Sequence, residues 1–316
     1  MLPTGAIDPL TGRSYHQIAA MSRSNHRSQD MGALQPAGPG ETRVAWVRGG
    51  AGKDVKDLFE GIDTRLTAMA AGIGDPARRS RAEERLRRVE AAVREARTKL
   101  GPATLGQTAS SLAAALGELS AARSLVEPSR DAGEAASAAF LDEKLKIAET
   151  ALAAASEVTV DATTDRETVA PGDSLEVKIG FWNGGSEPVR VEAVALTSPE
   201  GWEIAPSPEE PRDVAPGTLG EWTRKVSPAG AVPTIPYFLC RAMNGALYDW
   251  SEAPAAVRGE PFQPAALTAV VRARVRGAAL TLSRDVVYRF RDQALGEVRR
   301  PVRAVPALEV SVDPDR

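Results

Sequence analysis

The chain contains two histidines, His16 and His26, and both lie near its start. A catalytic zinc ion usually has three protein ligands drawn from His, Asp, Glu or Cys, with one coordination position left open. On one continuous helix, residues ten apart differ by about 80° in azimuth and by about 15 Å along the axis. His16 and His26 therefore cannot clamp one ion, and we interpret each as a surface or supporting residue. We expect no metal ion or other cofactor in this chain.

The residues around these histidines predict a helix that begins at Ser14. Gln17 follows Ser14 at the spacing of a capping box, in which each side chain bonds the backbone of the other residue. The helix would deliver His26, Ser28 and Gln29 to its end. The side chains that we expect it to bury are Tyr15, Ile18, Ala19 and Met21.

Three short segments in the first part of the chain occur in a characteristic order. They are SRSNHRSQDMG at residues 22–32, RVAWVR at residues 43–48 and FEGIDT at residues 59–64. Together they resemble the end of the catalytic domain in long bacterial members of the PIG-L/LmbE family of zinc-dependent N-acetylglucosaminyl deacetylases. The resemblance implies that residues 1–65 are the C-terminal remnant of such a domain. It also places His26, Ser28 and Gln29 at the rim of an active site that a missing domain would complete.

The same resemblance implies that the metal-binding part of the enzyme is missing. The family carries a motif of the Ala-His-Pro-Asp-Asp-Glu type and a later histidine, which supply zinc ligands and a base, and neither is present in this sequence. The chain would then be inactive by itself. Zinc would be held only by a full-length parent, and the missing N-terminal catalytic domain would be a partner.

Composition excludes several classes of function. The 316 residues contain 39 Lys plus Arg against 42 Asp plus Glu, and the net charge of −3 gives no general attraction to nucleic acid or to anionic membranes. Cys240 is the single cysteine, so no disulfide framework can form within the chain. We expect no transmembrane segment and find no signal peptide pattern at the start. Localisation stays open, because a parent protein could be exported.

Two short motifs resemble catalytic signatures but lack their partners. GGAGK at residues 49–53 is not a phosphate-binding loop, because Val47 and Asp54 stand where that loop needs a glycine and a hydroxyl. GDSL at residues 172–175 has no general base available, because no histidine follows His26. A metal-free hydrolase therefore has little support in the sequence.

Residues 66–156 predict an antiparallel bundle of three helices with short connections. Asp75 and Pro76 form a helix start, and Gly101 and Pro102 stop that helix. Apolar residues then recur at intervals of three and four. They are Leu86, Val89, Val93, Ala96 and Leu100 in the first helix, Leu112, Leu116 and Leu119 in the second, and Leu141, Leu145, Ala148 and Leu152 in the third.

After residue 156 the periodicity changes to the alternation that is typical of β-strands. The pattern predicts a β-sandwich over 157–229, which resembles the immunoglobulin-like accessory domains of carbohydrate-active enzymes. A second β-rich segment follows over 230–316, and whether it forms a second sandwich is left open. The expected strands are 175–181, 189–197 and 219–226 in the first segment and 267–275, 280–290 and 305–312 in the second.

Aromatic residues in the β-rich half are candidates for stacking on sugar rings, and core packing is the competing interpretation. The residues singled out for stacking are Trp202, Tyr248 and Trp250, followed by Trp222 and Tyr237. They make a glycan the candidate ligand of this half of the chain.

The sequence thus predicts an α+β multidomain chain with a deacetylase-domain remnant, a helical bundle and an immunoglobulin-like sandwich region. Two functions stay open. In the first, the chain is the non-catalytic C-terminal part of a deacetylase that hydrolyses the N-acetyl amide of a sugar or glycoconjugate. In the second, it is a free-standing module that binds a glycan or a protein through its sandwiches.

Overall fold

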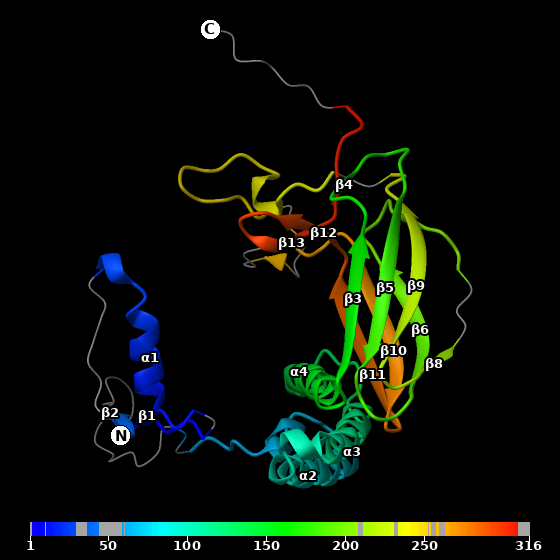
Figure 1. Cartoon of the computed structure of the whole chain (residues 1–316). Helices are drawn as coiled ribbons and strands as arrows, with labels where there is room; N and C mark the ends of the chain where they lie inside the picture. The colour runs from blue at the N-terminus through cyan, green and yellow to red at the C-terminus, as the bar shows by residue number, and fades with distance from the viewer. Residues whose placement is uncertain are drawn as a thin grey trace. The chain divides into compact units, whose positions relative to one another are not determined.

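The computed structural model describes residues 2–9, 11–29, 37–43, 59, 61–207, 211–230, 233–251, 253, 257–258 and 263–308. The chain divides into two compact units, residues 1–64 and residues 65–316. Figure 1 shows the course of the chain within each unit.

The first unit is a small helix and ribbon. Its elements are β1 (Leu2–Gly5), α1 (Tyr15–Arg23), the 3-10 helix η1 (Arg27–Gln29) and β2 (Gly40–Thr42). The capping box at Ser14 is confirmed, with the Gln17 backbone N–H donating to the Ser14 hydroxyl and the Ser14 N–H donating to the Gln17 side chain. The imidazole of His16 lies against the ribbon where Gly5 faces Gly40, since a Cβ at Gly5 would stand 2.6 Å from the His16 ring.

The buried face expected for α1 is wrong. Tyr15, Ile18 and Met21 are exposed, as is Ala19, and within the helix Ala20 is the buried residue. The physical reason is size, because a nine-residue helix beside a two-stranded ribbon has no surface large enough to cover an apolar stripe. The predicted strand at 43–48 lies outside the described residues, apart from its first residue, which is not in a strand.

Residues 65–156 form the predicted helices. They are η2 (Leu66–Ala70), α2 (Pro76–Thr98), η3 (Pro102–Thr104), α3 (Leu105–Arg123) and α4 (Ala132–Ala155). The Asp75 carboxylate accepts the Arg78 N–H and Pro76 is the first helical residue, so the predicted start of α2 is confirmed. The predicted buried stripe of α2 is correct at Leu86, Val89 and Ala96, but Val93 and Leu100 are exposed.

The β-rich half forms two facing sheets, one of four strands in the order β11-β10-β6-β8 and one of six in the order β13-β12-β3-β5-β9-β7. A short parallel pair, β4-β14, accompanies them. The strands are β3 (Val158–Thr164), β4 (Thr168–Val169), β5 (Leu175–Asn183), β6 (Val189–Thr197), β7 (Glu203–Ile204), β8 (Arg212–Val214), β9 (Thr218–Ser227), β10 (Thr268–Val275), β11 (Ala278–Asp285), β12 (Val287–Asp292), β13 (Gly296–Pro301) and β14 (Arg303–Ala304).

Strands from both β-rich segments share one sandwich. β10 pairs antiparallel with β6 along most of its length, so β10 and β11 complete the sheet that β6 and β8 begin. The single strand expected at 280–290 is wrong, because the chain breaks at buried Val286 and β12 continues in the opposite sheet. Of the strand expected at 305–312, residues 305–308 are not in a strand and the rest lies outside the described residues.

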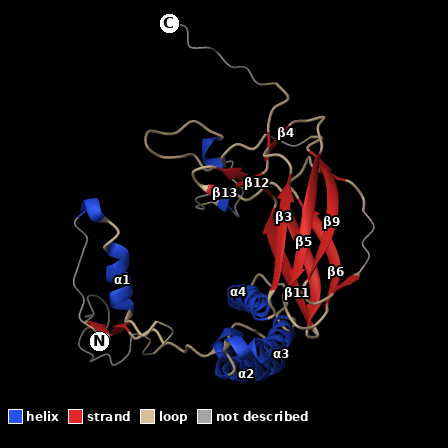
Figure 2. Ribbon diagram, viewed as in Figure 1, coloured by secondary structure: helices blue, strands red, loops and turns tan. Residues whose placement is uncertain are grey.

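The bundle and the sandwich share a hydrophobic core. Leu116 on α3 and Leu152 on α4 belong to the same buried cluster as Val158 and Phe181 of the sandwich. A second cluster fills the bundle around Leu86, and Leu145 and Ala148 pack against both clusters. Figure 2 shows the three long helices together at one end of the sandwich strands. The bundle therefore packs directly on the sandwich.

Two arginines connect the edges of the two sheets. The buried Arg224 of β9 donates through Nη2 to the Val194 carbonyl of β6 at 2.7 Å. On the other side of the sandwich, Arg284 of β11 donates through Nε to the Val160 carbonyl of β3 at 3.1 Å. Each bond satisfies a carbonyl at a strand edge, where it would otherwise lack a partner in the sheet.

Candidate binding surfaces

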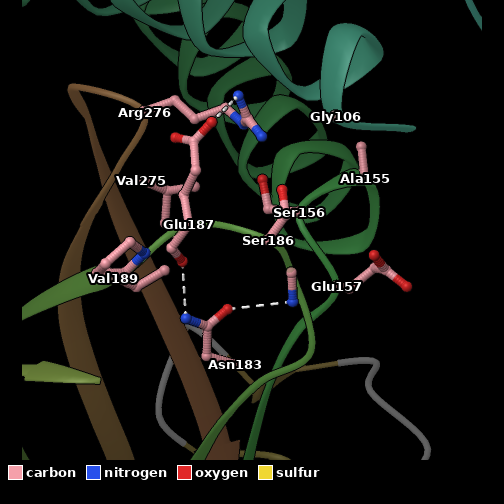
Figure 3. Close-up of a pocket in the computed structure, with 12 residues that line it drawn as sticks. Gly106, Ala155, Ser156, Glu157, Asn183, Ser186, Glu187, Val189, Val275 and Arg276 are labelled. Atoms are coloured by element: carbon pink, nitrogen blue, oxygen red, sulfur yellow. Dashed lines mark hydrogen bonds and ion pairs between the residues drawn. The ribbon is translucent and has the colours of Figure 1, made fainter. Parts of the chain in front are cut away.

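The backbone turns tightly and packs closely at the joint between α4 and β3. Glu157 has a left-handed φ of 56°, and a Cβ at Gly185 would stand 2.6 Å from the Ser156 carbonyl oxygen. Asn183 is fully buried beside them. Its amide nitrogen donates to the Glu187 and Val214 carbonyls at 2.9 Å each, and its oxygen accepts the Gly185 N–H at 3.1 Å. Figure 3 shows Asn183 and its bond to Glu187, together with Ser156 and Glu157.

Arg276 ties the tip of the β10–β11 hairpin to the same joint. It occupies the turn with Gly277, and both residues have positive φ, as a two-residue hairpin of type I′ requires. Its Nη1 lies 2.8 Å from a Glu187 carboxylate oxygen and 3.0 Å from the Ser110 hydroxyl of α3. The pocket among these residues has a volume of about 40 Å³, well below the roughly 300–1,000 Å³ of small-molecule sites. We interpret it as a structural joint and not as a ligand site.

The residues predicted at an active-site rim lie in the first unit. His26, Ser28 and Gln29 are all exposed, with His26 in the turn after α1 and the other two in η1. Across the described parts of the chain, no group of three or more His, Cys, Asp or Glu side chains is placed to hold a metal ion. Within those same parts, none of the helices has the length and apolarity that a bilayer crossing requires.

The aromatic residues singled out in the sequence have different environments. Trp202 and Trp222 are partly buried and pack against the sandwich core, and the Arg212 guanidinium lies 4.2 Å from the Trp222 ring centre. Tyr248 is 45% exposed and its ring centre lies 5.0 Å from that of Phe238. Trp250 is half-buried. The side chain of Tyr237 lies outside the described part of the structure.

Sequence reasoning missed a further exposed aromatic residue, Trp182. It follows buried Phe181 on β5, so strand alternation directs it to the outer face of the six-stranded sheet, where it is 43% exposed. Leu219 lies opposite it on β9 and is 53% exposed. The signal was present in the alternation of β5, but Trp182 also begins the Trp-Asn-Gly-Gly sequence that reads as a turn.

Charged residues lie beside this aromatic face. Gly180, two residues before Trp182, pairs with Asp161 on β3 and with Glu221 on β9. Arg299 donates to the Asp161 carboxylate at 2.7 and 3.3 Å. Burial by itself raises the pKa of Asp161, but the hydrogen bonds and charge of Arg299, joined by the charge of Arg289, lower it overall.

A groove of about 700 Å³ lies between α4 and the sandwich. It is lined by residues 146, 149, 150, 153 and 154 of α4, 158–160 of β3 and 281–284 of β11. Glu149 is partly buried here, and its carboxylate accepts the Thr281 N–H at 3.2 Å. Burial raises the pKa of Glu149, while the Thr281 hydrogen bond and the charge of Lys146 oppose that shift.

Comparison with known proteins gives one family match. Residues 169–238 match a family model described as "NPCBM-associated, NEW3 domain of alpha-galactosidase". The matched segment contains strands β5 to β9, and so includes Trp182 and Leu219. No curated protein matches the chain. The chain is an α+β protein whose sandwich is similar, over these residues, to the NEW3 domain.

Two solved structures show distant likeness. One is native alpha-2-macroglobulin from Escherichia coli, from domain MG7 to the C-terminus, with 13% identity over 48% of this chain and a TM-score of 0.27. The other is the alkylpurine DNA glycosylase AlkC of Pseudomonas fluorescens bound to DNA with an abasic site analog, with 13% identity over 70% of this chain and a TM-score of 0.20. The chain spans 17% and 63% of their respective lengths. At these TM-scores neither likeness bears on function.

Proposed function

We propose that residues 65–316 are a non-catalytic, carbohydrate-binding accessory module. The observation that carries the proposal is the match of residues 169–238 to a domain described with alpha-galactosidase, an enzyme named for acting on a sugar. That segment also supplies the exposed pair Trp182 and Leu219. Aromatic side chains with an apolar face and a polar edge suit the mixed surface of a sugar ring.

The shared core of bundle and sandwich supports the proposed role as an accessory module. Leu116 and Leu152 are fully or almost fully buried among sandwich residues, so helices and sheets form one packed body. Interiors of this kind are close-packed and transmit position from one element to the next. Such a module holds a bound sugar chain at a fixed place relative to its own ends.

The test is affinity electrophoresis of the whole chain in native gels that contain a soluble polysaccharide. Neutral galactomannan, glucan and xylan are the probes, and anionic polygalacturonate tests for charge-driven binding. We expect retardation by at least one neutral polymer relative to serum albumin on the same gel. Migration that no polymer changes would refute the proposed carbohydrate binding.

A second candidate is the C-terminal part of a PIG-L/LmbE-like deacetylase. The sequence segments 22–32 and 59–64, which follow each other as they do in that family, favour this candidate. The exposed apolar side chains Tyr15, Ile18 and Met21 of α1 also favour it, because they suit a helix that packs on a further domain. On this proposal residues 1–65 belong to the catalytic domain, with His26 at its rim. The bundle would then be 66–156 and the β-rich segments 157–229 and 230–316.

The reading frame upstream of the Met1 codon tests this second candidate. Codons for an Ala-His-Pro-Asp-Asp-Glu type motif, joined to Met1 without a stop, would support it. The extended protein should then hydrolyse an N-acetylated sugar in the presence of zinc. An in-frame stop codon close to Met1, with a ribosome-binding site between the two, would refute the deacetylase candidate and leave the accessory module as the proposal.

A further inference from the structure

The groove beside α4 exists because two strand edges face the helix there. β11 is the last strand of its sheet, and β12 pairs with β3 only at Thr163 and Thr164, so residues 158–162 of β3 also form an edge. α4 presents the small residues Ala153 and Ala154 to this region. The resulting volume of about 700 Å³ lies within the range of about 300–1,000 Å³ for small-molecule sites.

The lining supplies both kinds of hydrogen-bonding group. Lys146 and Arg284 are donors, and Glu149 is an acceptor. The hydroxyls of Thr281 and Ser283 can both donate and accept, and that of Thr150, which donates to the Lys146 carbonyl, can accept. Sugar hydroxyls likewise donate and accept, whereas a polyanion is bound best by a surface that carries only positive charge. The mixture of donors, acceptors and opposite charges therefore favours an uncharged sugar over an acidic one.

The groove continues to the aromatic face through Thr159. This residue lines the groove and is also the register partner of Trp182 across the β3–β5 pair, so the two side chains lie next to each other on one face of the sheet. Gly184 leaves room for the indole, because a Cβ there would stand 2.9 Å from Trp182 Nε1. The indole thus stands at the rim of a polar groove.

We infer that this groove, together with the ring of Trp182, is the binding site for an uncharged oligosaccharide. One sugar unit stacks on the indole and the neighbouring unit lies among the polar groups of α4 and β11. The inference rests on the carbohydrate-binding function proposed above and specifies its site and its class of ligand.

The test compares single variants with matched controls in the polysaccharide gels. Trp182→Ala removes the stacking ring, and Phe140→Ala is its control, because Phe140 on α4 is 50% exposed against 43% for Trp182 and does not line the groove. Lys146→Ala removes a groove donor, and Lys144→Ala is its control on the same helix, where it pairs with Glu143 and does not line the groove. Glu149 and Arg284 are left unchanged because they also bond strand edges.

We expect Trp182→Ala to weaken binding to the retained neutral polymer about tenfold, and Lys146→Ala about fivefold. Phe140→Ala and Lys144→Ala should bind like the original chain, and thermal melts of all four variants should stay close to that of the original chain, because each altered side chain is at least partly exposed.

Three results would overturn the inference in different ways. Unchanged binding by Trp182→Ala and Lys146→Ala, in a chain that does bind neutral polymer, refutes the site and leaves the proposed function in place. Stronger retention by polygalacturonate than by any neutral polymer refutes the class of ligand. Retention by no polymer at all refutes the proposed function, and the site with it.

Discussion

The shared core predicts that bundle and sandwich unfold as one unit, and Leu86→Ala tests this. Leu86 is fully buried in the cluster that fills the bundle, and that cluster includes Leu119 and Leu141 but no sandwich residue. Removing three carbon atoms costs about 2.4 kcal/mol of transfer free energy at about 0.8 kcal/mol each. The cavity left behind raises the loss to about 3–4 kcal/mol. For a unit of this size, that corresponds to a fall in Tm of about 6–16 °C.

Two optical probes follow the two halves separately. The five tryptophans are at positions 46, 182, 202, 222 and 250, so none lies in the bundle, and their fluorescence reports mainly on the sandwich. Circular dichroism at 222 nm reports mainly on the helices. We expect both midpoints to fall together in Leu86→Ala, because Leu145 and Ala148 pack against both clusters.

Leu100→Ala is the matched control, because Leu100 is 68% exposed just beyond the end of α2. Its midpoints should stay within the change expected of a surface substitution, about 0.5 kcal/mol. A helical midpoint that falls in Leu86→Ala while the fluorescence midpoint stays constant would refute the shared core as the link between the two halves.

Two further changes test close packing and a charge pair. Gly72→Ala should lower the free energy of unfolding by about 1–3 kcal/mol in urea titrations, because the new Cβ would stand 2.0 Å from the Gly133 carbonyl oxygen. Gly74→Ala is the control, because a Cβ there meets nothing within 4 Å, and its free energy of unfolding should stay close to that of the original chain. Asp161→Asn should destabilise the chain at pH 7, because Arg299 loses one of its two carboxylate partners and keeps only Glu297. Since the folded-state pKa of Asp161 is lowered, the stability that its charge contributes is present above its ordinary value of 3.8 and is lost as pH falls below it. The gap between Asp161→Asn and the original chain should therefore close on acidification, and a gap that stays constant from pH 7 to pH 3 would contradict the assignment.

Apolar periodicity in the sequence predicted the buried face of an element correctly where another element packs against that face. The alternation of β5 places Leu175, Val177, Ile179 and Phe181 inside, and all four are buried. The same logic failed for α1, where Tyr15 and its neighbours have no described surface to cover them. Apolar periodicity indicates which side of an element is available for burial, and it does not indicate whether anything covers that side.

Long-range pairing was not available from the sequence. The register that joins Val271 of β10 to Val194 of β6 links residues far apart in the chain, and no local pattern encodes it. The candidate groove depends on the same kind of information, since its lining comes from α4, β3 and β11. Trp182 was within reach of sequence reasoning, because its outward position follows from the inward position of Phe181.

The arginine bonds at the strand edges have a consequence for neighbouring molecules. An uncapped edge strand is a template on which a second chain can add a strand, and this is how sheets aggregate or exchange segments. Arg224 and Arg284 occupy carbonyls at such edges, and Glu149 occupies the Thr281 N–H. On the proposed function, many copies of this chain would bind side by side on one polysaccharide. Capped edges would prevent neighbouring bound copies from pairing their sheets, so that each copy could still dissociate from the polymer.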